Sequence, residues 1–176
     1  NSTFVAGDGS VLASFRNMDQ IISIAPDFQF IQWRLGGSGS NFTFPDPRDK
    51  FYHQHAAVPI PNGNVLLFDN GNFRPGKEGG WYSRALELEL DFETMTARKV
   101  WEYRHDPDIF SPGCSNVHRL ENGNTLVAFG QSREELCCRV FTVVEADPAG
   151  EVVWELEHRY PKKFAQYRVY PADSVM

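Results

Sequence analysis

The sequence predicts an all-β protein made of β-propeller blades, each a sheet of four antiparallel strands. One short unit, a tight turn followed by a strand, occurs three times, as GDGSVLASF, NGNVLLF and NGNTLVAF. The turn glycines Gly9, Gly63 and Gly123 stand 54 and then 60 residues apart. Each unit is followed by a strand that carries a tryptophan, in FIQWRLG, RKVWEYR and EVVWELE. A period of this size is typical of repeat architectures, in which each unit stacks on its neighbour.

The second repeat shows how one blade is built. HAAVPI and VLLFDNG flank Asn62-Gly63, and Asn-Gly supplies the positive φ angles of a tight hairpin turn. RALELELD then alternates apolar and polar residues, as a half-buried strand does, and RKVWEYR completes a blade over about residues 51–104. The same plan predicts a further blade over about 112–158. No long segment has a helical apolar period, so we expect little helix.

The remaining segments predict incomplete units. Residues 1–35 are expected to form a first blade that lacks most of its opening strand, because Asn1 aligns with His55 of the next repeat. The tail at 166–176, which contains QYRVYPADSV, is expected to begin a closing strand. Because a propeller needs at least four blades to close, we expect the other blades to come from the same protein or from another chain.

Composition limits the classes of partner. Apolar residues make up 41% and aromatic residues 14% of the chain, which carries a formal net charge of −6. A mildly acidic surface argues against nucleic acid and against anionic membranes as main partners. No apolar run approaches the 18 or so residues of a membrane-spanning helix.

Two features bear on the compartment. Asn1 and Asn41 each begin an Asn-X-Thr sequon, and Asn41 lies in a Gly/Ser/Pro-rich loop where a glycan acceptor would be accessible. The cysteines are Cys114, Cys137 and Cys138. Either Cys114 is linked by a disulfide to one of the other two, or all three are reduced thiols. The sequence favours a secreted or luminal protein.

Several motifs resemble the arylsulfotransferase (arylsulfate sulfotransferase-like) family. They are FYHQHAAVPIPNGNVLLFDNGN, YSRALELELD, VWEY, ENGNTLVAFG and YRVYPADSV, and the resemblance extends over essentially the whole chain. It implies a six-bladed propeller, of which this chain is roughly the second half. It also implies transfer of a sulfuryl group from a phenolic sulfate ester to another phenol through a sulfated histidine. No nucleotide sulfate donor or other cofactor is implied, and the expected ligand is a phenolic sulfate or another small aromatic molecule.

The resemblance implies catalytic roles for three residues. His55 stands in the QH motif of an innermost strand, and Arg74 follows the FDNG strand, where it is expected to hold sulfate oxygens. A neutral imidazole is a good nucleophile near pH 7. His118 is a second candidate nucleophile, but the turn alignment pairs it with Val58 and pairs Ser115 with His55. Strand alternation then turns His118 to the other face, so a packed histidine is the alternative interpretation.

Substrate contacts are expected from His53, Arg84 and Tyr52, with His53 on the same face as His55. The His-X-His pair is also a possible metal-binding pattern, but no third ligand is evident and no metal is expected. The second interpretation of function is a non-catalytic extracellular propeller that binds a ligand or a partner. Both functions stay open, because β-propellers include enzymes as well as non-catalytic binding proteins.

Overall fold

The structure, a computed structural model, describes residues 1–76, 81–133, 138–161 and 166–172. The first sheet contains β1 (Ser2–Val5), β2 (Val11–Phe15), β3 (Gln20–Ile24) and β4 (Ile31–Leu35). The second contains β5 (His55–Pro59), β6 (Val65–Asp69), β7 (Arg84–Asp91) and β8 (Thr96–Tyr103). The third contains β9 (Asn116–Arg119), β10 (Thr125–Arg133), β11 (Cys138–Ala146) and β12 (Val152–Pro161). The helical segments among the described residues are two 3-10 turns, η1 (Arg16–Met18) and η2 (Pro47–Asp49).

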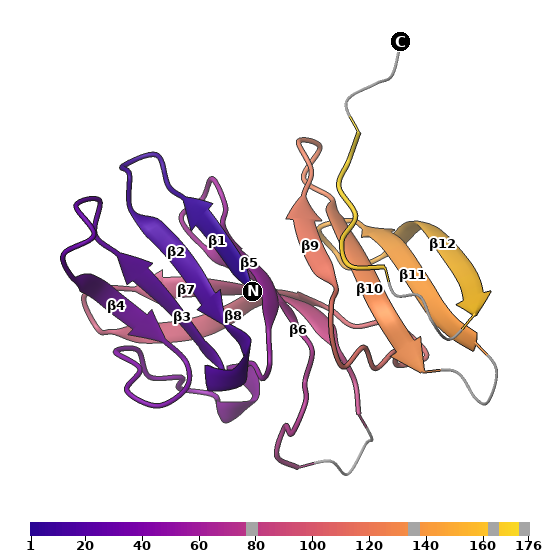
Figure 1. Cartoon of the computed structure of the whole chain (residues 1–176), viewed down its shortest axis with the longest axis horizontal. Helices are drawn as coiled ribbons and strands as arrows, with labels where there is room; N and C mark the ends of the chain where they lie inside the picture. The colour runs from indigo at the N-terminus through magenta and orange to yellow at the C-terminus, as the bar shows by residue number, and fades with distance from the viewer. Residues whose placement is uncertain (77–80, 134–137, 162–165, 173–176) are drawn as a thin grey trace.

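These three sheets of four antiparallel strands confirm the predicted all-β class and have the form of propeller blades. Figure 1 shows the first and third sheets on opposite sides of the molecule, with the second sheet between them. The first sheet differs from the expectation of an incomplete unit. Its opening strand β1 pairs with β2 over four residues, from Ser2↔Ser14 to Val5↔Val11. The hairpin turn before β2 fixes this pairing, so the first sheet also has four paired strands.

The three sheets repeat one another in detail. Each has a register shift between its third and fourth strands, next to Glu87 in the second sheet and next to Glu145 in the third. The residue before the shift faces the tryptophan of the fourth strand in every sheet: Ser23↔Trp33, Glu87↔Trp101, Glu145↔Trp154. A β-bulge increases the local twist of a strand. The same irregularity therefore lies next to the same tryptophan in all three sheets.

The Asn-Gly turns are held by a carboxylate from the third strand. In the second sheet, the side-chain amides of Asn62 and Asn64 donate to Glu87 Oε1 at 2.9 and 2.6 Å. In the third sheet, the equivalent amides donate to Glu145 Oε1. Glu87 Oε2 also accepts from Arg119 Nη2 in β9, at 2.5 Å. One buried carboxylate therefore ties a hairpin to its own sheet and to the next sheet.

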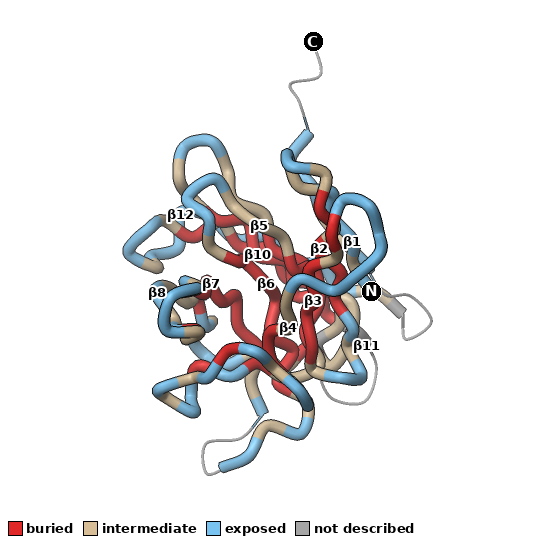
Figure 2. The backbone as a smooth tube through the Cα atoms, turned by 90° about the vertical axis from the view of Figure 1, so that its left-hand side faces the viewer, coloured by how far each residue is buried: buried red, intermediate tan, exposed pale blue. Residues whose placement is uncertain are grey.

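Apolar seams join neighbouring sheets. Leu67 and Leu86 of the second sheet pack with Ile21 and Leu35 of the first. On the opposite face, Phe68 packs against Phe129 of the third sheet, with the ring centroids 5.3 Å apart. Figure 2 shows the buried stretches inside the molecule and the loops exposed around them. The innermost strands β1, β5 and β9 lie next to one another, which gathers their side chains at the inner end of the blades.

The segment at 166–172 runs beside β9 without forming a strand (Figure 1). The Asn116 side chain donates to Val169 O at 2.7 Å and accepts from Val169 N at 2.9 Å. Arg168 Nη2 donates to Asn1 O at 2.6 Å. The predicted closing strand at 166–176 extends beyond the described residues, and it stays a prediction.

Candidate functional site

His55 is held by Asn70 at the inner end of the second blade. Its Nδ1 lies 2.6 Å from Oδ1 of Asn70, the residue that follows β6. Asn70 Nδ2 donates to Ser111 O at 2.7 Å and to Cys114 O at 3.4 Å. A carbonyl oxygen only accepts, so the amide nitrogen must face these two oxygens and Oδ1 must face the histidine. His55 Nδ1 is therefore the donor, and the lone pair of the neutral ring lies on Nε2.

The surroundings keep His55 uncharged. The residue is 5% exposed, and this burial, the largest effect, lowers the pKa of His55 below its ordinary value. The hydrogen bonds with Asn70 and with the His53 backbone raise the pKa of His55 but are smaller effects. Burial disfavours the charged form of an imidazole. At pH 7 His55 is thus a neutral imidazole whose Nε2 can accept a proton or attack an electrophile.

His53 does not share the environment of His55. It precedes β5 and has a φ of 56°, so the strand alternation that predicted a common face does not apply to it. Its backbone N donates to Asp19 Oδ1 at 2.6 Å. Its Nδ1 lies 3.1 Å from the same oxygen without forming a hydrogen bond. The His53 ring also contacts Phe73, with the centroids 5.2 Å apart.

Asp69 is the centre of a buried polar network on the opposite side of the β6 end. Its carboxylate is 0% exposed and accepts from Tyr52 N at 2.9 Å and Gly71 N at 3.1 Å. It also accepts from Arg74 Nη2 at 2.8 Å and Arg84 Nε at 2.9 Å. A buried carboxylate requires such compensation, because its desolvation is costly.

Arg84 acts mainly as a structural residue. It is 2% exposed, and besides Asp69 it donates to Glu102 Oε2, Arg48 O and Lys50 O at 2.8–3.0 Å. These four bonds use four of the five N–H donors of a guanidinium. Its predicted role in substrate binding would therefore depend on one remaining donor.

Arg74 lies with two tyrosines and not with His55. Its guanidinium carbon is 4.5 Å from the centre of the Tyr82 ring and 5.6 Å from that of Tyr52. Asp69 and Asn70 are successive residues, and their side chains point to opposite sides of the strand end. Asp69 binds Arg74, whereas Asn70 binds His55. Among the residues that the structure describes, no hydrogen bond joins Arg74 to His55. The two predicted catalytic residues thus stand on either side of one strand end.

His118 occupies a different position from His55. It pairs with Leu126 as Val58 pairs with Leu66, which agrees with the turn alignment. Leu126 belongs to the apolar cluster on the face of the third sheet that is turned away from the second sheet. Ser115 takes the place of His55, with a φ of 82° and its Oγ accepting from Gly130 N. His118 is half-buried on that face, and both interpretations of it stay predictions.

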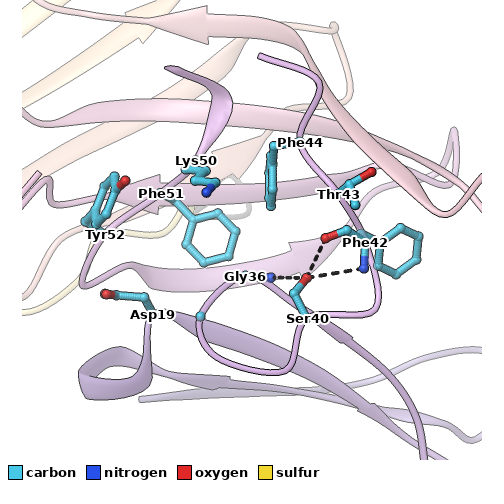
Figure 3. A pocket seen from close by; sticks show the side chains of 10 residues that line it. Asp19, Gly36, Ser40, Phe42, Thr43, Phe44, Lys50, Phe51 and Tyr52 are labelled. Carbon is cyan, nitrogen blue, oxygen red and sulfur yellow. Dashed lines mark hydrogen bonds between the residues drawn. The ribbon is translucent and has the colours of Figure 1, made fainter. Parts of the chain in front are cut away.

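Two neighbouring cavities lie beside the connection between the first and second sheets. The first, of about 430 Å³, is shown in Figure 3, and its lining includes Asp19, Ser40, Phe42, Phe44, Lys50, Phe51 and Tyr52. The second, of about 520 Å³, has a lining that includes Arg48, Lys50, Tyr52, Arg74, Trp81, Tyr82 and Arg104. The two cavities share Lys50 and Tyr52 and are therefore adjacent. Neither is lined by His55 or His118.

The other predicted sites have these positions. Asn41 is exposed, and its Oδ1 accepts from Arg34 N at 2.7 Å; Asn1 is also exposed. Cys114 is half-buried, whereas Cys137 and the side chain of Cys138 lie outside the described residues, so the disulfide stays a prediction. Within the described part of the chain, no group of three or more His, Cys, Asp or Glu side chains is placed to hold a metal. None of the described helices is long and apolar enough to cross a membrane.

The sequence analysis did not identify Asn70 and Asp69 as residues of the site. The signal available was their position in FDNG, between a buried strand and a glycine with positive φ. It also missed Asp19, which contacts His53 from 34 residues away. Only the packing of the first blade on the second brings these two residues together.

Comparisons with known proteins identify the family of the chain. The model of the Arylsulfotransferase (ASST) family matches residues 1–168, so the chain belongs to that family. It is 34% identical over 90 residues to the arylsulfate sulfotransferase AssT of Escherichia coli O6:H1 (strain CFT073) and 30% identical over 90 residues to that of Lelliottia amnigena. Each match covers 48% of this chain and only 15% of the relative.

Proposed function

We propose that the protein transfers a sulfuryl group from a phenolic sulfate ester to a phenol acceptor through a sulfohistidine at His55, without a nucleotide donor. The observation that carries the proposal is the fixed tautomer of His55. Asn70 binds Nδ1, and burial keeps the ring neutral, so Nε2 presents its lone pair at neutral pH. The family membership and the names of the two relatives support the same reaction class.

The transfer balances as two displacements at sulfur. In the first, the His55 Nε2 lone pair forms an N–S bond, the S–O bond to the donor breaks, and the donor leaves as a phenolate that takes up a proton. In the second, the acceptor phenol loses its proton and attacks sulfur, and the N–S bond returns its electron pair to Nε2. Throughout, Nδ1–H stays bonded to Asn70 Oδ1, which stabilises the positive charge on the sulfated ring.

The decisive assay is release of a chromogenic phenol from its sulfate ester by the full-length protein, with a phenol acceptor present. We expect His55→Ala to abolish release, because it removes the attacking nitrogen. Removal of such a group typically costs several kcal/mol of transition-state stabilisation. His118→Ala is the matched control: retained activity leaves His55 as the nucleophile. If His118→Ala, and not His55→Ala, prevents accumulation of the sulfated enzyme, His118 is the nucleophile. Absence of turnover in the intact protein would favour the non-catalytic binding propeller.

We further propose a secreted or luminal location, with a glycan on Asn41. The exposed Asn41 side chain and the polar loop around it support this site. Peptide mass spectrometry of the native protein provides the test. The proposal would be contradicted if Asn41 is unmodified and the three cysteines, Cys114, Cys137 and Cys138, are fully reduced.

We also propose that further blades complete the ring, supplied by the same protein or by another chain. Trp33 and Trp101 pack into the seams between neighbouring sheets, whereas the equivalent Trp154 is 42% exposed. A neighbouring sheet would cover Trp154 as it covers the other two. Light scattering of the isolated chain is expected to show self-association through this face, and a stable monomer would count against the proposal.

A further inference from the structure

An ion pair joins the second and third sheets at the end of the blades that carries the Asn-Gly turns. Arg119, at the end of β9, donates to Glu87 Oε2 at 2.5 Å. Its guanidinium carbon also lies 5.1 Å from the centre of the Trp101 ring. A carboxylate and a tryptophan face together favour a guanidinium group, through its charge and through cation–π attraction. In this seam the fold itself therefore holds a guanidinium between two blades.

The seam between the first and second sheets lacks both members of this ion pair. The strand registers place Ser23 in the position of Glu87, because each faces the tryptophan of its fourth strand. They place Pro59 in the position of Arg119, because each pairs with the first residue of the following strand. Trp33, the tryptophan of this seam, therefore lacks the neighbour that Arg119 provides in the next seam.

A cavity of about 320 Å³, which will be called the seam cavity, lies at this position. Its lining includes Asp8, Ser23, Gln32, Trp33, Pro59 and Phe92. Ser23 and Pro59 are smaller than the ion pair whose position they take, which accounts for the space. The Trp33 and Phe92 rings lie edge to face, with their centroids 6.3 Å apart. The seam cavity thus offers aromatic side chains where the next seam holds Arg119.

Asp8 gives the seam cavity a negative charge. It takes the turn position of Asn62, whose amide reaches the Glu87 carboxylate in the next repeat. The described lining contains no Lys or Arg, and Asp8 forms no ion pair within the described part of the chain. Its Oδ1 accepts from Ser10 Oγ at 2.7 Å and from Ser10 N at 2.9 Å. These two bonds hold the pKa of Asp8 below its ordinary value, so the carboxylate is ionised at pH 7.

We propose that the seam cavity binds a guanidinium group that comes from outside the described part of the chain. The group would stack on Trp33, as that of Arg119 does on Trp101, and would donate to the Asp8 carboxylate. A free small cation and an arginine side chain of a partner both carry this group, and the test separates them. Pro59 and His55 stand at opposite ends of β5, so this cationic ligand is independent of the proposed sulfuryl transfer.

The test titrates propylguanidinium, which resembles the end of an arginine side chain, into full-length protein with ¹⁵N-labelled tryptophan. We expect the indole N–H signal of Trp33, assigned by its loss in Trp33→Leu, to shift saturably. Asp8→Asn should weaken binding about two- to fivefold, as for an exposed ion pair. Propylurea lacks the charge and propylammonium lacks the planar group, so each should bind at least about fivefold more weakly. Acetyl-Gly-Arg-Gly-amide separates the two sources: binding tighter than that of propylguanidinium favours a partner's arginine, and weaker binding favours a free small cation.

Two further variants make the outcome specific. Asp27→Asn is the matched control, because Asp27 is an exposed turn carboxylate of the same sheet that accepts from Gln29 N but does not line the seam cavity. It should leave the dissociation constant of propylguanidinium unchanged. The combined variant Ser23→Glu and Pro59→Arg rebuilds the ion pair of the next seam. Its own guanidinium should fill the seam cavity and abolish the Trp33 shift, while its melting temperature shows that it is folded.

Several results would overturn the inference. One is a Trp33 signal that does not move, and another is equal affinity in the wild type and Asp8→Asn. Equal binding of propylurea or of propylammonium would also overturn it, because the site would then not select a guanidinium. A loss in Asp27→Asn as large as that in Asp8→Asn would reduce the effect to net charge. Retained binding in the folded combined variant would place the probe outside the seam cavity.

Discussion

Replacing Asn70 with aspartate tests how the protein prepares His55. The substitution puts a carboxylate where the amide oxygen now lies, 2.6 Å from His55 Nδ1. A neighbouring opposite charge typically raises the pKa of a cationic acid by about 1–3 units. In wild type, burial holds the pKa of His55 below its ordinary value. In Asn70→Asp the imidazolium form should therefore persist at pH 7, and its Nε2 would carry a proton instead of a lone pair.

The expected result is a displaced pH profile. At pH 7 we expect aryl sulfate turnover by Asn70→Asp to fall about 10- to 100-fold, because each pKa unit corresponds to about a tenfold change in the neutral fraction. Activity should recover as the pH is raised above the new pKa of His55. The measurement is the pH dependence of chromogenic phenol release between pH 5 and 10.

Asn70→Ala provides the matched control. It loses the same donors to Ser111 O and Cys114 O but adds no charge, so its profile should not move to higher pH. Two-dimensional ¹H–¹⁵N spectra of histidine-labelled protein report the tautomer without any turnover. The reasoning would be refuted if His55 of the wild type is protonated on Nε2. It would also be refuted if the pH profile of Asn70→Asp coincides with that of the wild type.

Three further outcomes follow from named contacts. The pKa of His55 is lower in the folded than in the unfolded protein, so the free energy of unfolding should fall as the pH drops below about 6.5. His55→Gln should remove that component of the pH dependence. An unchanged pH dependence in His55→Gln would contradict this prediction. Asp69→Ala leaves two guanidinium groups without their buried partner and should cost about 3–5 kcal/mol in denaturant unfolding. Asp46→Ala, which removes a half-buried carboxylate from a surface ion pair, should cost less than about 1 kcal/mol. Equal losses would argue against the network. Gly37→Ala should lower the melting temperature by more than Gly39→Ala. Both glycines have a positive φ, but only at Gly37 would a Cβ lie 2.2 Å from Met18 O. Equal melting temperatures would exclude that clash.

The blades could be predicted because their signals are local. Asn62-Gly63 and Asn122-Gly123 specify hairpins by backbone conformation alone, and the structure places both in equivalent turns closed from Ile60 and Leu120. The alternation in RALELELD likewise reports which side chains of one strand face a seam. The first blade was underestimated because the alignment counted residues, whereas strand pairing needs only the four that β1 supplies.

The site was less predictable because it depends on contacts between distant segments. Asn70 Nδ2 reaches the carbonyl of Ser111, which lies 41 residues further along the chain, and this contact decides which nitrogen of His55 is protonated. The positive φ of His53 likewise follows from the path of the chain into β5 and not from the residue type. No periodicity encodes either feature. The family resemblance identified the histidine, while its chemistry depends on the tertiary contacts around it.

The hydrogen bond from Arg168 to Asn1 O has a consequence for synthesis on the ribosome. The hairpins and the seam between the first two sheets involve only earlier residues, so they can form while the chain is still being made. The Arg168 contact spans 167 residues and cannot form until the tail has emerged. Until then β9 also lacks the backbone partner that Asn116 holds at Val169. Of these three blades, the inner end of the third is therefore completed last, and until then it stays accessible to chaperones.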